Sequence, residues 1–443
     1  MNAPLIPKDE FRPHGAPARS RLGSFDAMQS SALRAVVDEP ATAPLRSERP
    51  ARVVLVMDYA LDYLGGAQSA FLEQARALSD AGHEVTVLAP APQRWSHPWR
   101  PAPQSFVEVA APFVLPGIGL PGIRNTAALR RRLEREFIER GVDVVHVHSE
   151  FGLTAAALAV AEKLRIRTVS TVHTFYWQAA LPRPLAPLAA LGVVGFSRWL
   201  RGGDSTDPVG AALREVTRRA AARTGTVISP SAHQAEHLRA AGLAQTVSLE
   251  NVVAAAAEAP LPIGRVDGPL RILWVGRMEP EKRVLEFVEA VALAAERAGH
   301  GRLDIRIAGD GSLRTAAERL ALKHAAPIRF LGAVPRDRVR ALMRDSHLVA
   351  LTSYGFDNQP VTVAEALSEG RPVLYADPVL TEGLDEAGIL TAAPSANGIA
   401  DTVVQLAARP ELVVEASGRA VLAARRFSAD RHVPALQRVY SGR

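Results

Sequence analysis

Residues 52–85, RVVLVMDYALDYLGGAQSAFLEQARALSDAGHEV, begin the regular part of the chain. A short run of β-branched and other apolar residues leads into a turn with two glycines, and apolar residues then follow at helical spacing up to Gly82. A glycine just after the last periodic residue is typical of a helix end. We therefore predict a strand, a loop and a helix, with a second strand, EVTVLAP (84–90), directly after the helix.

The same alternation of apolar strands and amphipathic helices recurs along the chain. It continues with VDVVHVHSE (142–150), RTVSTVHTF (167–175) and TGTVISPS (224–231), and it restarts with LRILWVG (270–276), LDIRIAGDG (303–311) and HLVALTS (347–353). Continuous apolar strands that alternate with helices indicate parallel sheets covered on both faces. We predict an α/β protein with two doubly wound, Rossmann-like domains facing a cleft, and ligands at the carboxyl ends of the strands.

Four parts of the chain follow from this pattern. Residues 1–50 mix Pro, Ala, Ser and both charge signs without periodicity, which is typical of a disordered tail. Residues 51–260 form the first predicted domain and residues 265–424 the second, joined by a segment with Pro and Gly but no regular period. Residues 425–443 are predicted to form a helix that packs back on the first domain.

Composition excludes several classes of protein. With 48% hydrophobic and 22% charged residues among 443, the chain resembles a soluble globular protein, and the absence of Cys removes disulfides and thiolate metal sites. No apolar run reaches the ~18 residues of a spanning helix, and no signal peptide is recognisable, so we expect a cytoplasmic location. The net charge of +6 fits either an acidic partner or a general preference for Arg. Nucleic acid is ranked last, because no recognisable binding module is present.

Glycine turns stand at two predicted strand ends. Gly65 and Gly66 precede a helix N-terminus, where backbone amides and the helix dipole can bind an anion, although taken alone a Gly-Gly pair is more often an ordinary tight turn. Gly309 and Gly311 suggest a close backbone approach, with an ordinary turn as the alternative. The chain lacks the full G-x-G-x-x-G fingerprint and the Walker A sequence, which argues against a nicotinamide enzyme and a P-loop ATPase.

The second domain carries two cations and two carboxylates at predicted strand ends. Arg277 and Lys282 could converge on a diphosphate, although both could also be solvated loop residues. In TSYGFDNQPVTVAEALSEGRPVL (352–374), Asp357 falls in a loop and Glu365 within the next helix. The pair could hold hydroxyls of a sugar and a ribose, or flank a glycosidic bond for hydrolysis. Asp357 could instead cap the helix. A solvated surface position is a poor explanation for Glu365, because its neighbours in the sequence are apolar.

Three histidines lie at or just beyond strand ends of the first domain. His146 and His148 are two residues apart, so they share one face of a regular strand. No thiolate and no well-placed carboxylate completes a metal site, and we predict none. A structural role is expected for His146, whereas His173, beside Phe175, Tyr176 and Trp177, is predicted to reach the cleft and act in function.

These motifs, in this order, resemble family-4 retaining glycosyltransferases of the GT-B architecture over residues 52–430. The matching pieces are GGAQ, HVHSEFG, VSTVHTFYW, VISPS, VGRMEPEK, IAGDG and the carboxylate pair before EALSEGRPVL. The resemblance implies transfer of a hexosyl unit from a nucleotide-diphosphate sugar, a UDP- or GDP-hexose, with retained configuration and without a metal or other cofactor. It also implies that the first domain binds the acceptor and the second domain the donor.

The resemblance assigns roles to individual residues. Gly66 would present its amide to the diphosphate, Arg277 and Lys282 would neutralise the leaving group, and Glu365 would hold the ribose hydroxyls. His173 would lie near the reacting sugar, and Asp357 stands at the first position of the family's E-x7-E motif. Further donor-binding positions are Gly65, Gly309 and Gly311, the amides of Asn358, Gln359, Val361 and Thr362, and main chain from Gly332 to Val334 against the base.

Two departures from the family pattern affect the donor loop. Asp357 replaces Glu and is shorter by one methylene, and Gln359 with Pro360 replaces the common Phe-Gly. Proline restricts the backbone where the sugar is expected. A catalytically weak, sugar-nucleotide-binding paralogue is therefore one of the alternatives.

The acceptor is suggested by a weaker resemblance, to bacterial diacylglycerol glucosyltransferases and related lipid enzymes. An apparent insertion between Ala179 and Arg223 is first apolar and then basic, as expected of a segment that touches an anionic membrane surface, although a lid packed on the domain is the alternative. We expect a hydroxyl acceptor in a membrane lipid and a peripheral position on the inner face of the plasma membrane. A soluble acceptor, such as a sugar phosphate or a polysaccharide, remains the second hypothesis.

Overall fold

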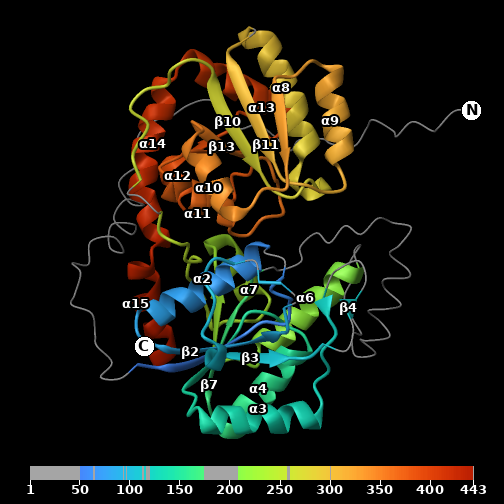
Figure 1. Ribbon diagram of the computed structural model, residues 1–443, viewed down its shortest axis with the longest axis vertical. Coiled ribbons are helices and arrows are strands. Elements are labelled where there is room, and N and C mark those ends of the chain that lie inside the picture. Colours follow the sequence, from blue (N-terminus) through green and yellow to red (C-terminus); the bar gives the residue numbers. More distant parts are fainter. Residues whose placement is uncertain are drawn as a thin grey trace, which may run out of the picture. The chain divides into compact units, whose positions relative to one another are not determined.

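The computed structural model describes residues 50–62, 65–92, 94–95, 97–111, 114–115, 120–173, 208–256, 260–299 and 301–442. Residues 50–443 group together as one unit and carry two large sheets (Figure 1). The predicted N-terminal tail and the apolar part of the predicted membrane-facing insertion lie outside the described residues.

The first sheet is entirely parallel. Its order is β3-β2-β1-β6-β7-β8-β9, so β1 pairs with β2 on one side and with β6 on the other. The order reverses between β1 and β6, which is the topological switch point of a doubly wound sheet. The described strands are β1 (Arg52–Val56), β2 (Glu84–Pro90), β3 (Phe106–Val109), β6 (Val144–Val147), β7 (Arg167–Thr171), β8 (Thr226–Ser229) and β9 (Thr246–Ser248). A small antiparallel pair, β4 (Val114–Leu115) and β5 (Leu120–Pro121), lies apart.

Helices cover both faces of this sheet because successive strand residues point to opposite sides. Val53 and Leu55 of β1 pack in one core with Phe71 of α2, whereas Val54 and Val56 pack in a second core with the helices on the other face. The helices of this region are α2 (Gly66–Asp80), α3 (Ala127–Glu139), α4 (Gly152–Leu164), α6 (Pro208–Ala221) and α7 (Ala232–Ala240).

The second sheet repeats this plan with the order β12-β11-β10-β13-β14-β15, again parallel. Its switch point lies between β10 and β13. The strands are β10 (Leu270–Val275), β11 (Leu303–Ala308), β12 (Ile328–Gly332), β13 (Leu348–Leu351), β14 (Val373–Tyr375) and β15 (Gly388–Leu390). The helices are α8 (Val284–Ala298), α9 (Arg314–Lys323), α10 (Arg336–Arg344), α11 (Val361–Ser368), α12 (Leu384–Ala387), α13 (Ala396–Ala408) and α14 (Glu411–Ala423).

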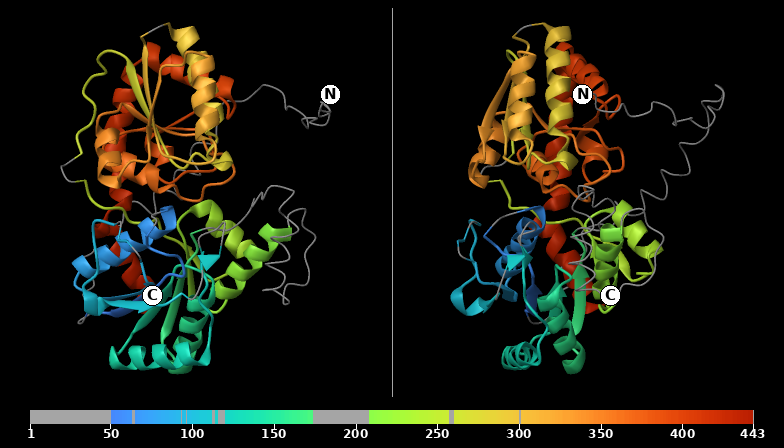
Figure 2. Two further views of the ribbon diagram at one scale, coloured as in Figure 1. Left: turned by 45° about the vertical axis from the view of Figure 1, so that its right-hand side comes forward. Right: turned by 90° about the vertical axis from the view of Figure 1, so that its right-hand side faces the viewer.

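The last helix, α15 (Ala429–Ser441), returns from the second sheet to the first. Figure 1 and Figure 2 show its red ribbon beside the blue α2. Val433, Leu436 and Tyr440 belong to the same core as Leu55 of β1 and Phe71 of α2. The chain therefore completes the core of the first sheet with its final residues.

Two parallel, doubly wound sheets confirm the predicted fold class. The strand ends that the sequence analysis marked, after β1, β7, β10 and β13, all belong to these sheets. Among the helices that the structure describes, none combines the length and hydropathy needed to cross a bilayer.

Candidate functional site

A cavity of about 860 Å³ lies where the carboxyl ends of the two sheets meet. Twelve of the fifteen predicted site residues line it: Gly65, Gly66, His173, Arg277, Lys282, Gly309, Val334, Asp357, Asn358, Gln359, Val361 and Thr362. The three that do not line the cavity are Gly311, Gly332 and Glu365. Most of the predicted residues line one cavity because the switch points of both sheets open onto it, as expected for ligand sites of doubly wound sheets.

The N-terminus of α2 faces the cavity through Gly65, Gly66 and Ala67. Gly65 is the N-cap residue, and no side chain caps the helix. The amides of the first turn and the positive end of the helix dipole therefore favour an anion. A Cβ added at Gly66 would have Val361 Cγ2 as its nearest neighbour, at 3.8 Å, so packing within the protein does not require glycine there.

The glycine turn after β11 has a different cause. A Cβ at Gly309 would lie 1.8 Å from the carbonyl oxygen of Gly276, and one at Gly311 would lie 2.7 Å from that of Met278. The close approach is therefore between two loops of the protein itself. Glu279 strengthens this contact, since it accepts hydrogen bonds from the amide and hydroxyl of Ser312 at 3.1 and 2.6 Å.

Lys282 and Asp357 form an ion pair beside the cavity, with Nζ 2.5 Å from Oδ1. The hydroxyl of Ser353 donates to the other carboxylate oxygen of Asp357. Thr352 donates to the main-chain oxygen of Lys282 at 2.8 Å, which ties the lysine loop to the end of β13. Pro360 occupies the N-cap position of α11, so the capping role considered for Asp357 does not apply.

Arg277 is the more exposed of the two predicted cations. Its side chain is 51% exposed and pairs with Glu281 at 2.8 Å, four residues on. In contrast, the side chain of Lys282 is 21% exposed. Both cations therefore already have carboxylate partners, which an incoming anion could exchange for its own charge.

The loop after Asp357 reaches the first sheet. Asn358 Nδ2 donates to Gln234 Oε1 at 2.6 Å and to the main-chain oxygen of His173 at 3.4 Å, and Ser231 donates to Asn358 Oδ1. Gln359 Oε1 accepts from the amide of Asn251 at 2.8 Å. The side chains of the predicted donor loop thus hold the two sheets' loops together.

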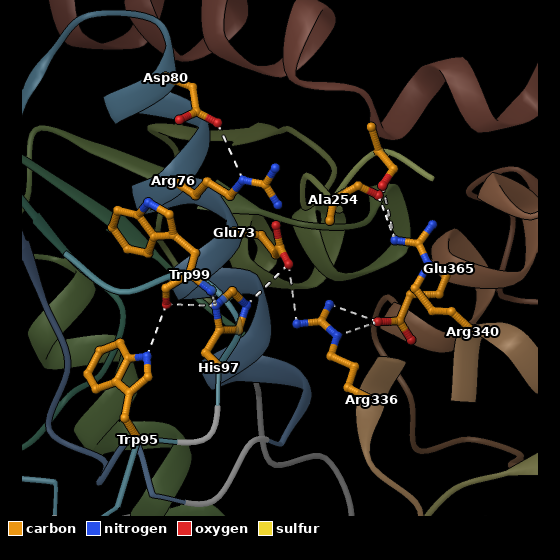
Figure 3. Close-up of polar contacts among 11 residues, drawn as sticks. Glu73, Arg76, Asp80, Trp95, His97, Trp99, Ala254, Arg336, Arg340 and Glu365 are labelled. Atoms are coloured by element: carbon orange, nitrogen blue, oxygen red, sulfur yellow. Dashed lines mark hydrogen bonds and ion pairs between the residues drawn. The ribbon is translucent and has the colours of Figure 1, made fainter. Parts of the chain in front are cut away.

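Glu365 lies outside the cavity lining and pairs with Arg336 (Figure 3). Both Nε and Nη2 of Arg336 lie 2.8 Å from Glu365 Oε1, and Nη1 lies 3.3 Å from Glu73 Oε1 on α2. Glu365 is 7% exposed, so the solvated reading of this residue does not hold. One arginine therefore stands between two buried carboxylates from the two sides of the cleft.

Glu73 has a second partner in His97, whose Nε2 lies 3.2 Å from Glu73 Oε1. Burial raises the pKa of Glu73, but the hydrogen bond from His97 and the charge of Arg336 lower it by more, so the pKa lies below its usual range. Sequence reasoning missed this pair of contacts. The available signal was a carboxylate on the apolar face of a predicted helix, since charged residues are seldom fully buried unless paired.

His173 lines the cavity, and its Nε2 lies 2.9 Å from Nδ1 of His148. Burial lowers the pKa of His173 to about 4, so its ring is neutral at neutral pH. His146 is fully buried, with Nε2 2.8 Å from Thr171 Oγ1 and Nδ1 2.8 Å from the Tyr440 hydroxyl. Within the described ranges no group of three or more His, Asp or Glu side chains is arranged to hold a metal ion.

Sequence reasoning also missed cavity residues from α7 and from the loop after β14. His233, Gln234 and Asp377 line the cavity. Asp377 Oδ2 accepts the amide of Gly355 at 2.6 Å and so shapes the loop that leads to Asp357. His233 and Gln234 follow the predicted strand at 224–231, and Asp377 follows β14. Their position at the carboxyl ends of strands was the available signal.

Comparison with protein families gives two matches that together span most of the chain. The model for "Glycosyltransferase Family 4" matches residues 64–249, and the model for "Glycosyl transferases group 1" matches residues 259–420. The first segment covers the first sheet except for β1, and the second segment covers the strands of the second sheet.

Individual proteins extend the comparison. A phosphatidyl-myo-inositol mannosyltransferase of Mycolicibacterium smegmatis is 28% identical over 367 residues, covering 80% of this chain and 84% of the relative. An alpha-monoglucosyldiacylglycerol synthase of Acholeplasma laidlawii is 30% identical over 149 residues, 32% of this chain and 36% of the relative. The solved structure of Anabaena HepE in complex with UDP superposes with a TM-score of 0.63 at 14% identity, over 88% of this chain and 100% of that one. This likeness concerns the fold, and it confirms the GT-B architecture.

Proposed function

Because this chain belongs to the family-4 glycosyltransferases, we propose that it moves a hexosyl unit from a nucleotide-diphosphate sugar to a hydroxyl group of a membrane lipid, with retained configuration. The observation that carries the donor part is the cavity at both switch points. It gathers the N-terminus of α2 and the cations Arg277 and Lys282 in one place. This combination suits a diphosphate.

The proposed role of Lys282 follows from its ion pair with Asp357. A bound diphosphate would compete with the Asp357 carboxylate for Nζ, and Lys282 with Arg277 would then stabilise the negative charge that grows on the departing nucleoside diphosphate. These two cations would do the work that a metal ion does in other sugar-nucleotide enzymes. We therefore propose a reaction that needs no metal and no other cofactor.

For the reaction itself we propose attack of the acceptor on the face of the sugar that the leaving group departs from. The bond from the anomeric carbon to the phosphate oxygen breaks, the bond from that carbon to the acceptor oxygen forms, and the acceptor proton passes to the departing phosphate. Such a reaction needs no protein nucleophile. His173 and Asp357, which border the same cavity, would then position the sugar.

Glu365 is proposed to hold the ribose hydroxyls, and its contacts set a condition on this role. Arg336 lies against Oε1, so ribose would use the other carboxylate oxygen or displace the arginine. The position of Glu365 on α11 favours use of the other carboxylate oxygen. Val361 and Thr362 at the start of this helix line the cavity, and Glu365 lies one turn further on.

The lipid acceptor is supported by the names of two relatives, which act on phosphatidyl-myo-inositol and diacylglycerol compounds. The rim of the cavity supports it as well, because Phe356 and Val379 line the cavity and yet are 39% and 50% exposed. Apolar side chains exposed at a site entrance suit a ligand with an apolar part. We propose a peripheral position on a membrane for the same reason.

The described part of the predicted membrane-facing insertion adds a qualification. Arg218 and Arg219 both pair with Glu215, at 2.7 and 2.6 Å, and Arg223 pairs with Glu162 at 3.3 Å. The side chains of these three arginines are about 40% exposed. Anionic headgroups would therefore compete with carboxylates of the protein at these positions.

The proposal is tested by incubating the purified chain with UDP- and GDP-hexoses and measuring nucleoside diphosphate release. We expect release to depend on vesicles that contain phosphatidylinositol or diacylglycerol, and to be lost in Lys282→Ala and strongly reduced in Glu365→Gln. Arg344→Ala, a change of a half-exposed cation away from the cavity, serves as the control. Release that needs a sugar phosphate or polysaccharide instead would show a soluble acceptor. Donor binding without turnover, not rescued by Asp357→Glu, would show a binding module.

A further inference from the structure

A chain of buried polar side chains connects His173 in the cavity with His432 on α15. From His173 Nε2 it runs to His148 Nδ1 at 2.9 Å, and from His148 Nε2 to the side-chain amide of Gln74 at 3.2 Å. The other end of that amide lies 3.2 Å from His432 Nε2, and His432 Nδ1 lies 2.9 Å from the main-chain oxygen of Glu250. Gln74, His148 and His432 are each at most 5% exposed, so water does not replace these bonds.

The direction of the hydrogen bonds can be worked out from the Glu250 end. A carbonyl oxygen only accepts, so His432 must carry hydrogen on Nδ1. Burial lowers the pKa of His432 to about 4, although the hydrogen bond to Glu250 and the charge of Glu250 act in the opposite direction. At neutral pH the ring is therefore neutral, and its Nε2 has a lone pair that needs a donor.

Two arrangements of the Gln74 amide satisfy the chain, and they differ by one proton. With Oε1 toward His432 and Nε2 toward His148, His432 must donate from both nitrogens and so be cationic. With the amide turned by half a rotation, its NH₂ donates to a neutral His432. Its oxygen then accepts from His148 Nε2 and also from His146 Nδ1, which lies 3.2 Å from the same end of the amide. In this second arrangement His148 Nδ1 is bare and accepts from His173 Nε2–H.

We propose that Gln74 and His148 are positioning residues that set the tautomer of His173: while His432 is neutral, His173 keeps its hydrogen on Nε2 and presents a bare Nδ1. Protonation of His432 would turn the amide and reverse the tautomer, so that Nδ1 of His173 would become a donor. Neither residue borders the cavity, and both act through the ring of His173.

Among the described residues, few groups face His432 and could disturb this arrangement. They are the carbonyl and carboxylate of Glu250, Gln74 from α2, and the imidazoles of His146 and His148 at β6, whose pKa values burial also lowers well below the usual range. The Glu250 carboxylate itself pairs with Arg426 at 2.9 Å. A neutral chain from His432 to His173 is therefore the resting state.

The consequence for the substrate rests on the proposed function. A bare ring nitrogen accepts a hydrogen bond from a sugar hydroxyl but repels a phosphate oxygen, which can only accept. The hydrogen-bonded chain from His432 through Gln74 and His148 to His173, here called the relay, would thus direct the hexose, and not the diphosphate, toward His173. Protonation at His173 would remove this discrimination, because imidazolium donates from both nitrogens.

The test is nitrogen NMR on the full chain labelled with ¹⁵N-histidine, with the His173 signals assigned from the spectrum of His173→Gln. At pH 7.5 we expect hydrogen on Nε2 and a bare Nδ1 in the wild type. Hydrogen on Nδ1 would overturn the proposal, and this measurement requires no variant of Gln74 or His148 to fold.

In Gln74→Leu the hydrogen bonds that connect His432 with His148 are lost, and we expect a mixture of both tautomers of His173. In Gln74→Glu, whose carboxylate can only accept, the wild-type tautomer should return.

Kinetics then separates the relay from the reaction. Gln74→Leu should lower kcat by about two- to tenfold, the value of one hydrogen bond, with little change in KM for the donor, and Gln74→Glu should recover most of the loss. An unchanged tautomer in Gln74→Leu would refute the relay even if the enzyme is active. The expected tautomers in a chain without transferase activity would refute the proposed function and leave the relay standing.

Discussion

Arg336 offers the sharpest test of how the two sides of the cleft are held together. Its guanidinium lies between Glu73 and Glu365, whose side chains are 5% and 9% exposed. Arg336→Met keeps an unbranched side chain and removes the charge, so two buried carboxylates lose the cation that they share. Among the residues that the structure describes, no second cation pairs with Glu365, whereas Glu73 keeps its contact with His97.

The size of the effect has a ceiling, because a carboxylate that is too costly to bury takes up a proton instead. Protonating a glutamate of ordinary pKa 4.5 at pH 7 spans about 2.5 pH units, or about 3.4 kcal/mol. We therefore expect Arg336→Met to lower the free energy of unfolding by about 3 kcal/mol at pH 7, within the range found for broken buried ion pairs. At pH 5 the same step costs about 0.7 kcal/mol, so most of the loss should disappear.

In the wild type the Glu73 carboxylate stays ionised at both pH values, and its own pH dependence lies lower. The pKa of Glu73 lies below its usual range, so its contribution to stability is present above pH 4.5 and is lost as the pH falls further. Urea unfolding followed by circular dichroism at pH 7 and pH 5 measures both values. Arg344→Ala is the matched control, since Glu369 keeps Arg340 at 2.5 Å, and it should cost under about 1 kcal/mol. A loss for Arg336→Met that is equally large at both pH values would refute the argument.

Three further predictions concern stability and catalysis. Gly309→Ala should lower the free energy of unfolding by about 2 kcal/mol or more, because its Cβ would meet the Gly276 carbonyl, whereas Gly66→Ala should change stability little and weaken donor binding in calorimetry. Lys282→Ala should lower kcat/KM by about a hundredfold or more, and the half-exposed Arg277 should matter less in the same assay. Acidification should destabilise the fold between about pH 6.5 and 4, by about 3 kcal/mol from the lowered pKa of His432 alone, and His432→Gln should flatten the unfolding curve measured across that window.

Much of the fold could be predicted because its signals are local. Apolar runs such as residues 52–58 and 270–276 mark buried parallel strands, and Gly82, at a φ of 87°, does follow the end of α2. The rule that ligands bind at the carboxyl ends of parallel strands predicts that Lys282 and His173 reach the cleft, and both residues line the cavity.

The contacts inside the site could not be predicted in the same way. Glu365 and Arg336 are 29 residues apart on different helices, and Glu73 lies on α2, which covers the first sheet. Such pairings depend on how two helices face each other, which periodicity does not specify. The resemblance suggested a partner for Glu365 in the ligand, whereas the structure shows a partner in the protein.

The return of α15 to the first sheet has a consequence for biosynthesis. Val433, Leu436 and Tyr440 fill the core around β1 and α2, yet they are made about 380 residues after β1 (Arg52–Val56). A nascent chain on the ribosome therefore carries the first domain with an open apolar surface while the whole second domain is synthesised, and exposed apolar surface of this kind favours aggregation. The domain that emerges first is finished last, and a stop codon shortly before residue 429 would leave its core uncovered.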